Sequence, residues 1–359
     1  MSDGTKIEWT DATLNVVNGC TVISPGCTNC YAMRAGGRNL PGHPSTGLTQ
    51  PSKAGHVWTG EVRFNQTALL QPLGWKRPRR IFWNAHGDLF HESVPIAWID
   101  KVFAVCALTP QHSHQILTKR SARMREYMND PAVVGRVAAI AAEIVPDGRD
   151  TYETGLRFVP GSGFGFASWP LTNVWLGVSV EDQRRADERV PDLLATPAAV
   201  RFISGEPLLG PIALTHIDLR KFGDRPTDLS NRLGDYVQPL RGNFTDSPKI
   251  NWVIVGGESG PGARPMHPDW ARSLRDQCAA AGVPMLFKQW GEWTPGDNAE
   301  STLDRRTVDT ATWFDERWSF ETVRGDFNFH SDDEPDMYRA GKKASGRKLD
   351  GVQHDGMPA

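Results

Sequence analysis

Short apolar runs alternate with helix-like stretches about seven times along this chain, and this order limits the possible folds more than any other feature. Each run ends in polar or Gly-rich residues, which is typical of βα units that place their strands parallel in one sheet. The expected strands cover residues 81–84, 114–118, 174–178, 200–204, 252–255 and 284–288, with an earlier one near 6–10. The expected helices cover residues 96–107, 122–129, 184–194 and 269–281.

This alternation predicts an α/β fold built on one parallel sheet. Right-handed crossovers would close the sheet into a full or partial parallel βα barrel, and an open doubly wound sheet is the alternative. The 359 residues have room for a barrel of about 250 residues plus insertions. We expect the barrel domain over residues 1–293, with polar insertions near 146–171 and 212–249. Residues 294–359 then form a C-terminal extension, an irregular cap that packs on the barrel.

The composition is that of an ordinary globular protein, with 39% hydrophobic and 23% charged residues. The first residues lack the basic start and apolar run of a signal peptide, and no stretch approaches the roughly 18 apolar residues of a membrane span. We therefore expect a cytoplasmic protein without a membrane partner. The net charge of -2 gives no overall attraction to nucleic acid, but a local basic groove is compatible with it.

Three of the five cysteines are close together in a C-x6-C-x2-C pattern formed by Cys20, Cys27 and Cys30. An odd number of cysteines with this spacing does not fit a disulfide framework. Two thiolates two residues apart can face one metal, and the turn at 24–26 can bring Cys20 back to them. Thiolate-rich sites select zinc or iron–sulfur clusters.

Because no fourth cysteine lies near these three, two kinds of metal site are considered. Structural zinc takes four ligands, whereas a 4Fe-4S cluster held by three cysteines keeps one iron open for a substrate or cofactor. We favour the cluster over zinc, and both over three unligated thiols. Cys106 lies in an apolar run and Cys278 in a helix, so both are expected to be core or surface cysteines and not ligands. A fourth zinc ligand would have to come from His43, His86, His91, Cys106 or Cys278.

Longer motifs resemble a known family. They are IEWTDATLNVVNGCTVISPGCTNCYA, RRIFWNAHGDLFHESVP, HQILTKR, VWLGVSVEDQRRAD, RFISGEPLLGPI, WVIVGGESGPGARPMHPDW and FKQWGEW. Together they resemble the phage-associated three-Cys-motif family over nearly the whole chain. The resemblance implies a barrel enzyme of the radical S-adenosylmethionine type, distantly similar to spore photoproduct lyases.

The resemblance also implies a cofactor set. In radical S-adenosylmethionine enzymes, three cysteines after the first strand hold a 4Fe-4S cluster whose open iron binds the methionyl amine and carboxylate. An electron from a donor such as flavodoxin or ferredoxin then cleaves the cofactor to a radical. The matching residues are Cys20, Cys27 and Cys30, with Tyr31 in the aromatic position beside the last cysteine. The first gap is longer here than in the usual C-x3-C-x2-C spacing.

Further cofactor contacts are expected where the strands end, because loops at that edge surround the mouth of a barrel. The turn Gly256-Gly257-Glu258 resembles the Gly-Gly-Glu motif that meets the methionyl amine, and a simple tight turn is the alternative. Ser179 and Glu181 fit contacts to the cofactor ribose or carboxylate, and helix capping is the alternative.

Cations near the same edge are candidates for substrate binding. A phosphate or carboxylate group would be neutralised there, although each cation could equally be a solvated residue near a helix end. The stretch 75–80 combines Trp75 with four basic residues and could hold a nucleic-acid backbone, or simply lead into the next strand. The candidate substrate residues are His86, which could also donate a proton or bind a metal, and Lys119, Arg120, Arg264 and Lys288.

These features predict a radical S-adenosylmethionine-type iron–sulfur enzyme with DNA, RNA or a nucleotide as substrate. The first alternative is a non-catalytic iron–sulfur or zinc protein that binds nucleic acid. The second is a redox-responsive or light-responsive cluster protein, for which the 13 Trp residues are the only indication.

Overall fold

A computed structural model describes residues 5–358 except 6, 54, 145–155, 160–162, 167, 220–234, 245–246, 300–306 and 325–335. Its centre is a seven-stranded parallel sheet in which neighbouring strands follow the order of the chain. Since the order never reverses, the sheet is a partial barrel and not a doubly wound sheet. The strands are β1 (Ala12–Leu14), β6 (Arg80–Trp83), β7 (Ser113–Thr118), β10 (Val174–Ser179), β11 (Val200–Gly205), β14 (Trp252–Gly256) and β15 (Met285–Gln289).

The predicted α/β fold with a partial parallel barrel is confirmed, and six of the seven strands lie within a residue or two of their expected positions. The first strand was wrongly predicted at 6–10, because the strand begins at Ala12. The preceding segment turns instead, with the Thr10 N–H donating to the Ile7 carbonyl at 3.3 Å. This turn buries Trp9 against the inner face of the sheet.

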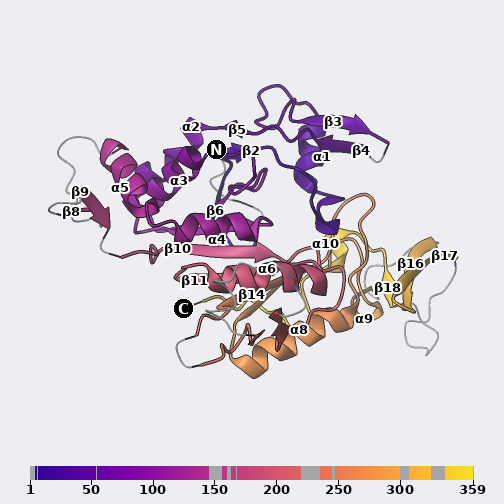
Figure 1. The fold of residues 1–359 in the computed structure, drawn as a ribbon. Coiled ribbons are helices and arrows are strands. Elements are labelled where there is room, and N and C mark those ends of the chain that lie inside the picture. Colours follow the sequence, from indigo (N-terminus) through magenta and orange to yellow (C-terminus); the bar gives the residue numbers. More distant parts are fainter. Residues whose placement is uncertain are drawn as a thin grey trace.

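The four predicted helices are present, and Figure 1 places α3 and α4 beside the early strands and α8 beside the late ones. Among the described residues one further long helix, α5, was not predicted even though its sequence VVGRVAAIAAEI has an apolar face. The helices are α3 (Ile96–Leu108), α4 (Ser121–Asn129), α5 (Val133–Ile144), α6 (Gln183–Ala195) and α8 (Pro268–Ala281).

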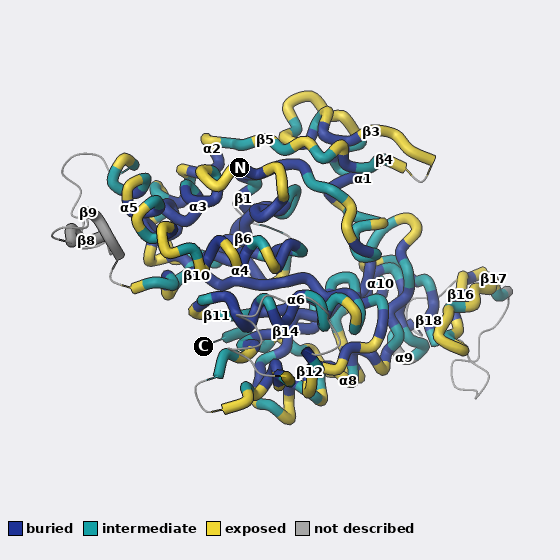
Figure 2. The backbone as a smooth tube through the Cα atoms, viewed as in Figure 1, coloured by how far each residue is buried: buried dark blue, intermediate teal, exposed yellow. Residues whose placement is uncertain are grey.

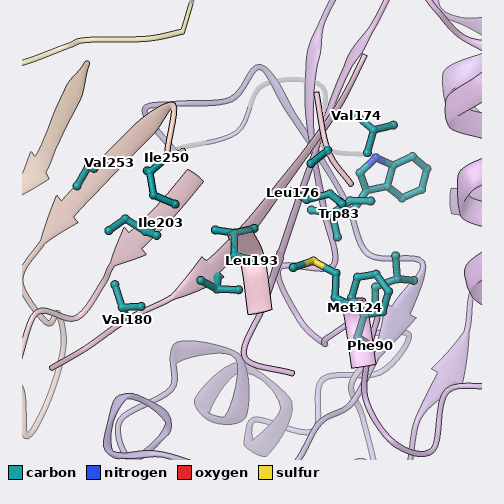
Figure 3. Close-up of a cluster of buried hydrophobic side chains, with 14 of the residues drawn as sticks. Trp83, Phe90, Met124, Val174, Leu176, Val180, Leu193, Ile203, Ile250 and Val253 are labelled. Atoms are coloured by element: carbon teal, nitrogen blue, oxygen red, sulfur yellow. The ribbon is translucent and has the colours of Figure 1, made fainter. Parts of the chain in front are cut away.

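Alternation of side chains along the strands divides the core between the two faces of the sheet. Trp83, Leu176 and Val253 join the large cluster beneath the helices, part of which Figure 3 shows. Their neighbours Phe82 and Trp252 belong to a smaller, aromatic cluster on the inner face. Figure 2 shows strands of the central sheet, such as β10 and β14, as buried.

Short elements decorate the barrel. The first insertion contains the hairpin β8–β9 and the second the pair β12–β13, within the described residues. The remaining elements are β2 (Val17–Asn18), η1 (Pro25–Cys27), α1 (Tyr31–Gly37), β3 (Thr49–Ser52), β4 (Gly55–Trp58), β5 (Arg63–Phe64), α2 (Gln66–Leu69), η2 (Gln71–Gly74), β8 (Leu156–Val159), β9 (Gly163–Phe166), β12 (Ile217–Asp218), β13 (Tyr236–Val237), α9 (Gly296–Ala299), β16 (Thr307–Phe314), β17 (Arg317–Arg324), β18 (Met337–Tyr338) and α10 (Lys342–Ser345).

The C-terminal extension is more regular than the predicted irregular cap. β16, β17 and β18 form an antiparallel sheet, and the β16–β17 turn places Asp315 and Glu316 at positive φ, as a two-residue hairpin turn requires. The chain then returns to the barrel, where the Phe287 N–H donates to the His354 carbonyl at 2.9 Å. The tail thereby covers the edge strand β15. Among the described helices, none is long and apolar enough to cross a membrane.

Candidate functional site

The three clustered cysteines lie on the segment between β2 and α1, and all three line one cavity of about 130 Å³. The same cavity is lined by residues at or just after the carboxyl ends of β6, β7 and β10, among them Asn84, Lys119 and Ser179. The segment 19–30, which we call the cysteine loop, therefore lies against the edge of the sheet where reactive groups gather in parallel barrels. The three predicted metal ligands thus line the same cavity.

The described residues contain no group of three or more His, Cys, Asp and Glu side chains already arranged to hold a metal ion. Cys106 and Cys278 both lie in the hydrophobic core, and neither lines the cavity. His43 and His86 lie near each other, with ring centroids 5.3 Å apart, and His91 contacts the Thr21 hydroxyl at 3.1 Å.

Burial keeps at least two of the thiols protonated while they have no cation to bind. It raises the pKa of Cys20 to about 12, assisted by the nearby Asp88 carboxylate and opposed by Arg120. Burial also raises the pKa of the Cys30 thiol. Any metal group that uses these sulfurs must therefore displace protons, which makes its binding dependent on pH.

Arg120, after β7, anchors the start of the cysteine loop. Its guanidinium donates to the Cys20 sulfur at 3.3 Å and to the Thr21 hydroxyl at 2.6 Å. Asp88 holds the same guanidinium at 3.2 Å and accepts from the Thr118 hydroxyl at 2.6 Å. The ends of β6 and β7 are thus connected to the loop at the first cysteine.

Glu181, after β10, anchors the middle of the loop. Its carboxylate is 1% exposed, accepts from the Gly26 N–H at 3.2 Å and pairs with Arg189 at 2.9 Å. Although burial alone would raise it, Lys119 and Arg189 hold the pKa of Glu181 below its ordinary value. The predicted cofactor residue therefore positions the turn that carries Cys27, and a direct cofactor contact stays a prediction.

Glu258, after β14, anchors the end of the loop. It accepts from Asn29 Nδ2 at 2.9 Å and pairs with Arg264 at 2.7 Å. Arg264 in turn donates to the Pro25 carbonyl at 3.0 Å. Although burial alone would raise it, the hydrogen bonds from Arg264 and Asn29 hold the pKa of Glu258 below its ordinary value. The anchor thus requires the ionised carboxylate.

Replacement of Glu258 by Gln is expected to lower the free energy of unfolding by about 1.5–3 kcal/mol at pH 7, because hydrogen bonds to a charged group are lost. The folded-state pKa is depressed, so this contribution is present above the unfolded value of about 4.3 and is lost as the pH falls through the folded value. Urea unfolding at pH 7 and below pH 4 should show the difference from wild type shrinking in acid. A difference that is constant with pH would contradict this assignment.

The two glycines before Glu258 lie in a turn that packs closely against neighbouring parts of the protein. A Cβ on Gly257 would lie 1.9 Å from the Trp290 carbonyl oxygen, and one on Gly256 would lie 2.8 Å from a Glu206 side-chain oxygen. The Gly257 N–H donates to the Gln289 carbonyl at 2.9 Å. Both glycines thus have a packing role that accounts for the motif without a cofactor.

The remaining candidate residues differ in the contacts that their side chains already make within the protein. Lys288 pairs with Glu206 at 2.9 Å, and this carboxylate outweighs burial and raises the pKa of Lys288. Burial and His43 lower the pKa of His86 to about 4, so its imidazole is neutral at pH 7. Tyr31 is 55% exposed and donates its hydroxyl to the Ala85 carbonyl at 2.7 Å.

Lys119 stands apart from these residues. Within the described parts of the chain, its ammonium makes no hydrogen bond or ion pair, although its charge lowers the pKa of Glu181 and opposes the burial that raises the pKa of Cys30. Ser179 also lines the cavity. Lys119 and Ser179 are therefore the candidate residues whose side chains are most available to an incoming ligand.

The basic stretch 75–80 lies away from this site. Arg79 stacks over the Trp75 ring at 4.5 Å, and Arg80, at the amino end of β6, pairs with Asp11 at 2.7 Å. Arg80 borders an open groove of about 560 Å³ that His112 and Trp175 also line. The stretch therefore lies at the opposite ends of the strands from the cysteine loop, and its contact with nucleic acid stays a prediction.

Sequence reasoning did not single out Asn29 or Arg189, which complete two of the three anchors. One sequence feature could have identified Asn29, because a residue between two closely spaced cysteines must lie in the same loop. A weaker sequence feature could have identified Arg189, since it lies about two helical turns after Glu181 and could face back toward it.

The chain belongs to a family described as "Protein of unknown function (DUF5131)", whose model matches residues 4–358. No curated protein and no solved structure matches it.

Proposed function

We propose that this protein is an iron–sulfur enzyme of the radical S-adenosylmethionine type, with a 4Fe-4S cluster held by Cys20, Cys27 and Cys30. The observation that carries the proposal is that the three cysteines line one cavity at the carboxyl ends of parallel strands. That edge is where parallel barrels carry out chemistry, and three thiolates without a fourth suit a cluster with one open iron.

The donor set and its surroundings fit such a group. The half-buried thiols of Cys20 and Cys30 have raised pKa values, and a bound metal would supply the positive charge that favours their ionised form. Arg120 and Lys119 offset the negative charge that thiolates bring into the cavity. The three anchors hold the loop at both ends and in the middle, so the sulfurs keep their places without a disulfide.

When bound, the cluster would supply the electron that cleaves S-adenosylmethionine. The protein's own part is to bind, orient and exclude water. Trp58, Phe82 and Leu117 form an apolar wall of the cavity, which limits solvent around reactive species. Lys119 is the cation available for an anionic group of the cofactor or substrate. A donor such as flavodoxin or ferredoxin is expected as the redox partner.

We propose DNA, RNA or a nucleotide as the substrate class, on the strength of the resemblance to spore photoproduct lyases. The alternative is a non-catalytic iron–sulfur or zinc protein that binds nucleic acid, and the basic stretch 75–80 favours it because this stretch lies apart from the cysteine loop. The alternative predicts strongly salt-dependent binding of nucleic acid without affinity for S-adenosylmethionine.

The test is cleavage of S-adenosylmethionine by the anaerobically reconstituted and chemically reduced protein, with and without added nucleic acid. We expect 5'-deoxyadenosine and methionine from the wild type and from a Cys278→Ala control, but not from Cys27→Ala. Release of neither product under any condition, from protein that carries a full cluster, would reject the enzyme and favour the binding protein.

A further inference from the structure

Arg120 was expected to bind substrate, but its guanidinium has no donor left for one. An arginine has five N–H groups in a fixed planar fork. Nε donates to Glu92 at 3.3 Å, Nη1 to Cys20 Sγ at 3.3 Å and Asp88 at 3.2 Å, and Nη2 to the Thr21 hydroxyl at 2.6 Å and the Thr21 carbonyl at 3.4 Å. Every N–H therefore has an acceptor within the protein.

The position of Arg120 makes its contact with sulfur electrostatically strong. The side chains of Arg120 and Asp88 are 5% and 7% exposed, so water screens their charges little. A charge-assisted hydrogen bond to a thiolate is stronger than one to a neutral thiol. Asp88 and Thr21 fix the direction of the guanidinium, so the contact does not depend on a flexible side chain finding the sulfur.

Lys119, the neighbouring residue, provides a natural comparison. It lines the same cavity and carries the same charge, but no hydrogen bond joins it to a cysteine sulfur in the described residues. The two adjacent cations are therefore divided in role: one is committed to a cysteine, and the other is open to an incoming ligand.

We propose that Arg120 is a positioning residue that donates to the Cys20 sulfur and raises the reduction potential of the cluster held there, and that it does not bind substrate. This inference rests on the proposed function. Hydrogen bonds to cluster sulfurs and nearby positive charge favour the reduced state, because reduction adds negative charge to the cluster.

The test is a redox titration of the reconstituted protein, followed by electron paramagnetic resonance of the reduced cluster. Arg120→Met is expected to disfavour reduction about tenfold, which is about 59 mV for a one-electron couple. Arg120→Lys keeps the charge but loses the fork, so an intermediate shift is expected. Lys119→Met removes an equal charge from the same cavity and should shift the potential less than Arg120→Met.

The outcomes separate this inference from the proposed function. Full clusters with equal potentials in the wild type and Arg120→Lys, or equal shifts in Arg120→Met and Lys119→Met, would overturn the inference alone. If Arg120→Met fails to fold, the comparison of Arg120→Lys with wild type decides. A wild type that binds no iron and sulfide would overturn the proposed function and this inference with it.

Discussion

Replacement of Glu181 by Ala is expected to lower the free energy of unfolding by about 3–5 kcal/mol, because it leaves the charge of Arg189 buried without its partner. The Arg189 side chain is 6% exposed, so water cannot take the place of the carboxylate. The same change removes the acceptor of the Gly26 N–H and frees the turn that carries Cys27. Urea unfolding of the metal-free protein measures the first effect, and iron content after reconstitution measures the second.

Two variants make this test specific. Glu188→Ala removes a carboxylate from α6, the helix that carries Arg189, where Glu188 pairs with Arg184, and should cost less than about 0.5 kcal/mol. The double variant Glu181→Leu, Arg189→Met removes both charges and should recover most of the lost stability. It should not recover the iron content, since the Gly26 anchor is still absent. Equal iron content in the wild type and the double variant would show that Glu181 does not position the loop.

Replacement of Gly257 by Ala is expected to destabilise the protein by about 3 kcal/mol, at the upper end of overpacking effects. The new Cβ would lie 1.9 Å from the Trp290 carbonyl oxygen. The backbone at Gly257 or at Trp290 would have to move, and this would break the contact between the loops after β14 and β15. Because Glu258 is the next residue, the shift should also disturb the anchor at Asn29. Thermal and urea unfolding would measure the change.

Gly256→Ala is the matched control. Its Cβ would meet a Glu206 carboxylate oxygen at 2.8 Å, and a side chain can move where backbone cannot. We expect a cost of about 1 kcal/mol. If the two variants were equally stable and only Gly257→Ala lost affinity for S-adenosylmethionine, the turn would be a cofactor contact and its packing role secondary.

The sheet was predictable because each strand of a buried parallel sheet is a short, nearly continuous apolar run. For apolar runs as short as 174–178 and 252–255, a central strand is the structure that buries the side chains on both faces. The first strand was misplaced because β1 has only three residues, and the more apolar neighbours Ile7 and Trp9 lie just before it. Trp9 packs in the inner cluster from a turn, which periodicity cannot reveal.

Most residues of the candidate site were predictable from the sequence, but the contacts between them were not. Cysteine spacing identified Cys20, Cys27 and Cys30, and the strand-end rule identified Arg120, Glu181 and Glu258. Sequence alone could not show that these three side chains bind the cysteine loop, because the contacts join residues far apart in the chain. Gly26 and Glu181 are 155 positions apart, and Asn29 and Glu258 are 229 apart. Long-range pairing of this kind depends on how the partial barrel places the ends of its strands beside one another.

The central claim is that the three clustered cysteines hold a 4Fe-4S cluster, and iron and sulfide content of anaerobically purified protein tests it most directly. The account predicts about four iron and four sulfide per chain, with the visible absorption of a cluster. Both should be lost in the Cys20, Cys27 and Cys30→Ala triple variant and kept in Cys278→Ala. Stoichiometric zinc without sulfide, or iron that survives in the triple variant, would contradict it.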